Sequence, residues 1–314
     1  MANTLSYASS IDVTDADKFI PDVWSDDVIA GYKKNLVIAA RVARINHMKK
    51  KGDVIHIPKP VRGAASAKSA NNVVTLVTST ATEQLVNLNK HFEYSFLVED
   101  IVEVQGLPSL RRFYTDDAGY ALATQTDSDL RDLAATWNSG TSYSGAVIGS
   151  DGSTAWSPTA NANAGNGAAL TDAGIRRVLQ TLDDGDVPMR DRCLILPPVE
   201  KRRLLGITRF TEQAFVGEQG AGNSIRNGLI GDVYGVEVYV STNIASFAAT
   251  DTTTFYRPCL LFQKDAVVLA EQMGVRVQAQ YKQEALGTLV TSDRLYGVAT
   301  IRIEGARAIM VPTL

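Results

Sequence analysis

The pattern of apolar positions predicts that helices and strands are mixed along this chain. Between about residues 24 and 44, apolar side chains recur every three to four positions, for example at Val28, Tyr32 and Leu36. This is the spacing of one face of a helix. Aspartates precede these positions and arginines follow them, an arrangement that suits the helix dipole. We therefore predict a helix over residues 24–44.

Residues 49–98 instead predict a projecting β-hairpin. Two short runs with strand character, "DVIHIP" and "VVTLVTST", flank a loop of small residues, "VRGAASAKSANN". The next run, "HFEYSFLVED", alternates strictly and places Phe92, Tyr94 and Phe96 on one face. A hairpin of this size buries little apolar surface by itself. It must therefore pack on its own body or lie on a neighbouring molecule.

The strongest helix pattern runs from a capping Ser109 to about Trp137. Such a helix has about 28 residues and a length of roughly 40 Å, which exceeds that of an ordinary globular helix. Residues 138–168 follow and are rich in Ser, Asn, Gly and Ala. This composition predicts a surface insertion, with a small hairpin near residues 146–156.

From Leu170 onward the pattern is typical of an α/β region. A helix begins at Thr171 or Asp172, the run "DRCLILPP" predicts a buried strand, and a second helix begins at Pro198. A glycine-rich loop then leads to the strand "VEVYVST". The last sixty or so residues are mostly strands, with a helical segment predicted at 286–296.

Composition limits the classes of protein that this chain can belong to. With 314 residues and 45% hydrophobic content, it is long enough for a substantial core. The net charge of −3 gives no global indication of nucleic-acid binding. Cys193 and Cys259 are too few for a disulfide framework. All apolar runs are far shorter than the roughly 20 residues of a membrane helix. We expect a soluble protein without a membrane partner.

Motifs that carry chemistry are missing from the sequence. His47, His56 and His91 occupy separate elements without metal-binding spacing. The glycines of "GEQGAG" reverse the dinucleotide-binding order, and "GTSYSG" lacks the nucleophile-elbow spacing. We therefore expect no catalytic residue, no cofactor and no metal. Two alternatives stay open: a binding protein or enzyme with an unrecognised site near the glycine-rich loop 217–235, and a nucleic-acid-binding module that uses the basic segment 41–68.

Charge is distributed in blocks of alternating sign. Residues 1–30 hold six aspartates and one lysine, and residues 41–68 hold eight basic side chains and one aspartate. Residues 99–132 hold eight acidic and three basic side chains. These blocks are either ordinary solvated faces or complementary patches through which subunits recognise one another. The second interpretation gives these candidate inter-subunit residues: Asp22, Trp24, Asp26, Asp27, Lys49, Lys50, Lys51, Lys59, Arg62, Lys68, Asp116 and Asp117.

Several segments of the chain carry a family resemblance. The first half contains, in order, "FIPDVWSDDVIAGYKKNLVIAARVAR", "KKGDVIHIPK", "FEYSFLVEDIVEVQG" and "ALATQTDSDL". The second half contains "GLIGDVYGVEVYVSTNI", "LLFQKDAVVLAEQ" and "YGVATIRIEGARAIMV". In this order and spacing, the segments resemble those of tailed-bacteriophage major capsid proteins. The resemblance begins near residue 19 and implies an α+β fold of the Hong Kong 97 type.

The resemblance also implies a division of the chain into five parts. These are an N-terminal arm with the first helix (1–47), an extended β-hairpin loop with the strand after it (48–98), a peripheral domain with a long spine helix and the surface insertion (99–169), an axial domain (170–255), and strands that return to the peripheral domain (256–314).

By the same resemblance, the chain is expected to self-assemble as hexamers and pentamers of an icosahedral phage head. The shell encloses double-stranded DNA, which the chain contacts non-specifically. The implied partners are a portal, a separate scaffolding protein and a cement protein. The expected location is the virion, after assembly in the cytoplasm of the bacterial host.

Overall fold

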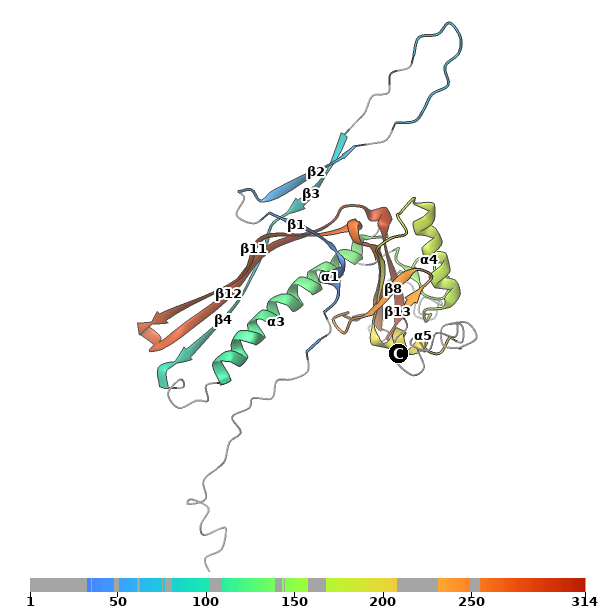
Figure 1. The fold of residues 1–314 in the computed structure, drawn as a ribbon. Coiled ribbons are helices and arrows are strands. Elements are labelled where there is room, and N and C mark those ends of the chain that lie inside the picture. Colours follow the sequence, from blue (N-terminus) through green and yellow to red (C-terminus); the bar gives the residue numbers. More distant parts are fainter. Residues whose placement is uncertain are drawn as a thin grey trace, which may run out of the picture.

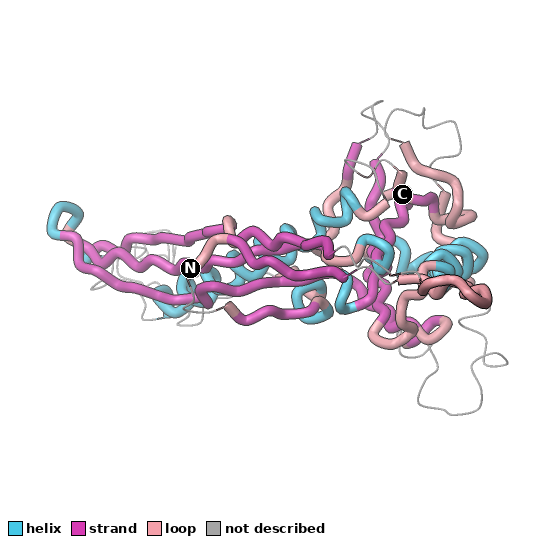
Figure 2. The backbone as a smooth tube through the Cα atoms, turned by 90° about the horizontal axis from the view of Figure 1, so that it is seen from above, coloured by secondary structure: helices cyan, strands magenta, loops and turns pink. Residues whose placement is uncertain are grey.

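The computed structural model describes residues 33–34, 36–47, 51–60, 63–74, 76, 81–101, 109–138, 143, 145–157, 168–207, 231–248 and 255–313. In this part of the chain, a long layer of strands and one long helix extends to one side of a more compact region (Figures 1 and 2). A thin hairpin projects from the junction of the two (Figure 1). None of the helices described has both the length and the apolar character needed to cross a membrane.

The elongated region is a sheet that one helix covers. Its strands lie in the order β1 (Ala43–Asn46), β11 (Val267–Lys282), β12 (Gly287–Thr300) and β4 (Lys90–Glu99). Helix α3 (Ser109–Asp132) continues into the 3-10 turn η3 (Leu133–Thr136) and packs on β4 and β12. Burial alternates along β4, and Tyr94 donates a hydrogen bond to Asp117 of α3. The predicted long helix and the predicted alternating strand are confirmed.

The compact region holds the second sheet. Its strands are β5 (Val147–Ile148), β13 (Ala306–Pro312), β10 (Phe255–Gln263), β6 (Arg192–Leu196), β8 (Val236–Val240) and β7 (Asp232–Val233), in that order, and β9 (Phe247–Ala248) pairs with β10. Helices α4 (Asp172–Asp184) and α5 (Pro198–Leu204) lie beside it. Thr171 caps α4 by accepting a hydrogen bond from the amide of Gly174, and every residue of β6 is buried. These elements match the predictions for this region.

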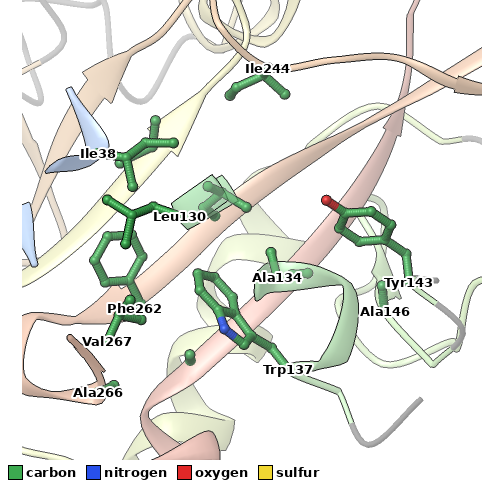
Figure 3. Packing of buried hydrophobic residues seen from close by; sticks show 14 of the residues in the cluster. Ile38, Leu130, Ala134, Trp137, Tyr143, Ala146, Ile244, Phe262, Ala266 and Val267 are labelled. Atoms are coloured by element: carbon green, nitrogen blue, oxygen red, sulfur yellow. The ribbon is translucent and has the colours of Figure 1, made fainter. Parts of the chain in front are cut away.

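One hydrophobic core joins the two regions where α3 ends (Figure 3). Trp137 is buried there, 5.5 Å from the ring of Phe262 on β10, and its indole nitrogen donates to Thr300 on β12. The small hairpin predicted near residues 146–156 is also present, with a bridge between Val147 and Ala155. The long helix is thus fixed to both sheets at this end.

The projecting hairpin is formed by β2 (Val54–Pro60) and β3 (Ala81–Asn87), which pair antiparallel. The hairpin was predicted, but its returning strand is wrong. Val73, Val74 and Leu76 of the predicted strand "VVTLVTST" lie outside any strand. The paired ladder ends at Pro60 and Ala81, so these three residues find no strand to pair with in the described part of their own subunit.

Two predicted helices are also wrong. Within residues 24–44, the described residues from 33 onward contain only the four-residue helix α1 (Ile38–Arg41), and residues 43–46 form β1. Residues 24–32 lie outside the described residues. The segment 286–296 is strand β12, except for Leu286 in the preceding turn. Pairing with β11 decides both cases, because a ladder of backbone hydrogen bonds outweighs weak helical periodicity.

Candidate inter-subunit interface

The tip of the hairpin is exposed and partly apolar. All residues from 63 to 74 are exposed, including Lys68. The exposed fractions of Val73, Val74 and Leu76 are 90%, 61% and 85%. Apolar side chains this open to water gain little from folding of the subunit itself. Three such residues on one projection make the tip a candidate surface for contact with another molecule.

The base of the hairpin, in contrast, is firmly attached. Val86 and Leu88 are buried against Ala270 of β11. The amide of Leu88 donates to the backbone carbonyl of Asp53 over 2.7 Å, and the side chain of Gln272 donates to the carbonyl of Gly52 over 2.9 Å. Because its base is fixed and its tip is exposed, the hairpin projects from the subunit in a defined direction.

The root of the N-terminal segment is fastened along α3. The amide of Lys34 donates to the hydroxyl of Tyr120 over 2.7 Å, and the amide of Ala39 donates to Asp127 over 3.0 Å. The ammonium group of Lys34 also reaches the side-chain oxygen of Asn243 over 3.2 Å. The segment therefore follows α3 before it enters β1.

Asp127 and Asn243 form the centre of this contact. Asp127 is fully buried, and burial raises the pKa of its carboxyl group. Hydrogen bonds from the backbone of Ile38 and Ala39 favour the charged form and partly oppose that shift. Asn243 donates to the hydroxyl of Ser128. Sequence reasoning missed this cluster, although aspartates on the buried side of a predicted helix were a signal for it.

Two substitutions of Asp127 separate its role as a hydrogen-bond acceptor from the cost of its buried charge. We expect Asp127→Ala to destabilise the subunit by about 1–3 kcal/mol, because the amide of Ala39 loses its buried acceptor. Asp127→Asn keeps an acceptor and removes the titration. A raised pKa means that the stability from the neutral form is present below the ordinary aspartate pKa of about 3.9 and is lost as the pH rises through the folded value. Asp127→Asn should therefore gain stability relative to wild type between pH 4 and pH 7, as measured by thermal unfolding. Equal losses for both variants at every pH would contradict this role.

The structure places only some of the predicted interface residues. Lys51, Lys68 and Asp116 are exposed. Asp117 accepts the hydrogen bond from Tyr94, and Lys59 pairs with Glu304 of its own subunit at 3.6 Å. Among the described residues, the basic side chains of the hairpin and the acidic side chains of α3 are not brought together within one subunit. The other predicted interface residues lie outside the described residues: Asp22, Trp24, Asp26, Asp27, Lys49, Lys50 and Arg62.

The two alternative sites receive little support from the described residues. Arg41 pairs with Glu237 at 3.1 Å, and Arg44 donates to the carbonyl of Ala39, so two basic residues of segment 41–68 are engaged inside the subunit. Residues 217–230 of the glycine-rich loop lie outside the described residues. Among the residues described, no three His, Cys, Asp or Glu side chains gather as a metal site would require.

Comparisons with known proteins agree on one family. The profile of the family described as "Phage capsid protein" matches residues 63–311, which is most of the chain. No curated protein matches the sequence. The fold is similar to a solved structure of Mycobacterium phage Che8, with a TM-score of 0.69 and 22% identity, over 93% of this chain and 97% of that one.

Two cyanophage structures are similar in the same way. The capsid structure of cyanophage P-SCSP1u has a TM-score of 0.72 and 20% identity, over 95% of this chain and 94% of that one. The capsid of cyanophage Pam1 has a TM-score of 0.72 and 13% identity, with 99% of each chain covered. The long helix, the two sheets and the projecting hairpin of this chain thus form a known architecture. The chain belongs to the phage capsid protein family, and it is a major capsid protein with the Hong Kong 97-type fold.

Proposed function

We propose that this protein assembles as hexamers and pentamers into the icosahedral head shell of a tailed phage, around double-stranded DNA. The observation that carries the proposal is the hairpin, which is anchored at its base and exposes an apolar tip. An isolated subunit leaves that tip in water, whereas a neighbour in a shell covers it. Repetition by symmetry then adds many modest contacts into a stable assembly.

The division into five parts belongs to the same proposal. Residues 1–47 serve as the arm, 48–98 as the extended loop and 99–169 as the peripheral domain. Residues 170–255 serve as the axial domain, and 256–314 return to the peripheral domain. The packing of α3, in the peripheral domain, on β12 supports the last assignment for β11 and β12, whereas β10 and β13 pair in the sheet that also holds β6 and β8 of the axial domain.

The partners follow from this role. A portal, a separate scaffolding protein and a cement protein join the shell, which assembles in the cytoplasm of the bacterial host and becomes part of the virion. Contacts with the packaged DNA are non-specific, since a chain with a net charge of −3 has no strong general attraction for phosphate. The chain performs no catalysis and uses no cofactor.

The direct test is assembly of the purified protein. Negative-stain microscopy and analytical sedimentation of the expressed chain, alone and with a phage scaffolding protein, should show capsomers or closed shells. A strictly monomeric species under every such condition would argue against the proposal. Salt-sensitive DNA binding by that monomer would favour the nucleic-acid-binding alternative.

The run Lys49, Lys50 and Lys51, which precedes the hairpin in the sequence, gives a further prediction. We expect changing Lys49, Lys50 and Lys51 to glutamate to reduce the yield of shells at least tenfold while the subunit remains folded, because complementary charges steer subunit association. Sedimentation measures shell yield, and circular dichroism measures folding. The matched control is the same triple change to arginine, which keeps the charge and should assemble normally. A loss of solubility equal to the loss of assembly would show that these lysines serve the fold.

A further inference from the structure

The two regions of the subunit are joined by one hydrophobic core at the end of α3. In that core, Trp137 lies beside Phe262 of β10, with 5.5 Å between the ring centroids. Packed bodies that share one line of contact can still tilt about it through small sliding movements of their side chains. Contacts beside the core therefore help to set the angle between the elongated region and the compact region.

One such contact is made by the segment Leu36–Arg41 together with Lys34, which we call the strap. The strap lies where α3 approaches the compact region (Figure 1). Its attachment to α3 is buried. The amide of Ala39 donates to Asp127, which is 0% exposed, and Ile38 is buried in the core at the end of α3 (Figure 3). This end of the strap is thus held by a buried hydrogen bond and by apolar packing.

The strap also reaches the compact region. The guanidinium group of Arg41 lies 3.1 Å from the carboxylate of Glu237 and 4.1 Å from the centre of the Tyr239 ring, both on β8. Tyr239 donates a hydrogen bond from its hydroxyl group to the same carboxylate. These three side chains contact one another pairwise, which orients the guanidinium group. A second contact joins the ammonium group of Lys34 to the side-chain oxygen of Asn243 over 3.2 Å.

The two attachments differ in strength. The side chains of Arg41 and Glu237 are 40% and 51% exposed. Ion pairs this open to water are individually weak and are screened by salt. The strap is therefore firmly fixed to α3 and adjustable at β8. This difference allows β8 and its sheet to shift against α3 while the strap stays in place.

An adjustable angle has a use in the proposed shell. Hexamers and pentamers place the same chain in two kinds of ring, which differ in the angle between neighbouring subunits. The chain must therefore accept small differences in shape without losing its fold. Close packing resists such differences, whereas a weak polar contact between two well-packed bodies permits them.

We propose that the strap sets the angle between the elongated and compact regions, and that the contact of Arg41 with Glu237 and Tyr239 limits the range of that angle. The inference rests on the proposed function for its effect on the shell, but the contact itself lies within one subunit. Loss of the contact widens the range of angles, and shells built from such subunits vary in size. A strap that only stabilised the fold would instead lower the melting temperature without changing the angle.

Distances between two spin labels on dissociated subunits measure the angle. Asp116 of α3 and Arg177 of α4 are exposed and lie in different regions, so cysteines at these positions accept the labels. The native thiols do not interfere, because Cys193 is 3% exposed and Cys259 is 0% exposed. Pulsed electron paramagnetic resonance then gives the distribution of label-to-label distances in the full chain.

Three variants are compared. Arg41→Met removes the guanidinium group and keeps an unbranched apolar stem, and Glu237→Gln removes the charge on the other side of the contact. We expect either change to broaden the distance distribution by about half, since a weaker contact admits more angles. Arg44→Met is the matched control. Arg44 donates to the carbonyl of Ala39 within the strap, so its loss should leave the distribution as in wild type.

Shell size is the second measurement, made by negative-stain microscopy on the same variants without labels. We expect the fraction of particles outside the main size class to rise about fivefold in Arg41→Met and Glu237→Gln, and to stay unchanged in Arg44→Met. Distances or shell sizes equal to those of wild type in both strap variants would overturn the proposal. Glu237 is half exposed, so Glu237→Gln decides the question if Arg41→Met does not fold. If the wild-type chain forms no shells, the proposed function fails, whereas the distance measurement still decides the role of the strap.

Discussion

Changing Val73, Val74 and Leu76 together to aspartate should abolish shell assembly and leave the subunit folded. These side chains are 90%, 61% and 85% exposed, so their replacement removes little packing from the subunit. In an assembled shell, the same change forfeits roughly 1.5–3 kcal/mol for each side chain that would have been fully buried. It also forces three carboxylates out of water, which adds several kcal/mol. The loss recurs in every subunit, so we expect no shells by sedimentation and an unchanged melting temperature of the subunit.

A charge-matched variant distinguishes apolar contact from simple repulsion. Ser66, Ser69 and Asn71 are exposed on the same tip, and their change to aspartate adds the same charge without removing apolar surface. We expect this variant to assemble, with at most a modest reduction that salt relieves. If both variants fail equally and salt rescues both, repulsion alone explains the effect. If the variant with aspartate at positions 73, 74 and 76 assembles at the wild-type yield, the apolar side chains of the tip have no part in shell stability.

The sequence predicted elements well where one face of each was buried by the body of the subunit. Strand β4 alternates because α3 covers one side of it, and α4 begins where Thr171 caps it. The returning strand of the hairpin was misplaced for the opposite reason. The Val73–Val74 run favours a strand, but a strand needs a partner, and residues 81–87 hold the position opposite β2. Local preference therefore placed a strand in a segment for which the described part of the subunit supplies no partner strand.

The interface residues were harder to predict than the fold. Charge blocks indicate that a surface is polar, but they do not identify the partner. Lys59 was assigned to a neighbour and instead pairs with Glu304 of its own subunit. Asp127 was counted among the surface acids of α3, yet it is buried beneath the backbone of the arm segment. Ala39 and Asp127 are 88 positions apart and Lys59 and Glu304 are 245 apart, so no local pattern encodes these contacts.

Gly297 gives the second large prediction, because it sets how closely the hairpin approaches the sheet. It lies on β12 opposite Ala270, and a β-carbon at this position would meet the backbone of Asn87 and Leu88 where β3 ends. Backbone atoms cannot turn aside as a flexible side chain can. Alanine at position 297 must therefore push Val86 and Leu88 of the hairpin base away from Ala270 of β11.

We expect Gly297→Ala to destabilise the subunit by about 1–3 kcal/mol, as overpacking typically does, and to lower shell yield because the hairpin leaves at a changed angle. Gly119→Ala is the matched control. A β-carbon there meets no atom within 4 Å, and the residue lies inside α3, so alanine should stabilise by up to about 1 kcal/mol. Urea unfolding measures both free energies, and sedimentation measures assembly. A Gly297→Ala subunit as stable as wild type would show that the hairpin base yields without cost, and the direction of the hairpin would then have to be fixed by the neighbouring subunit.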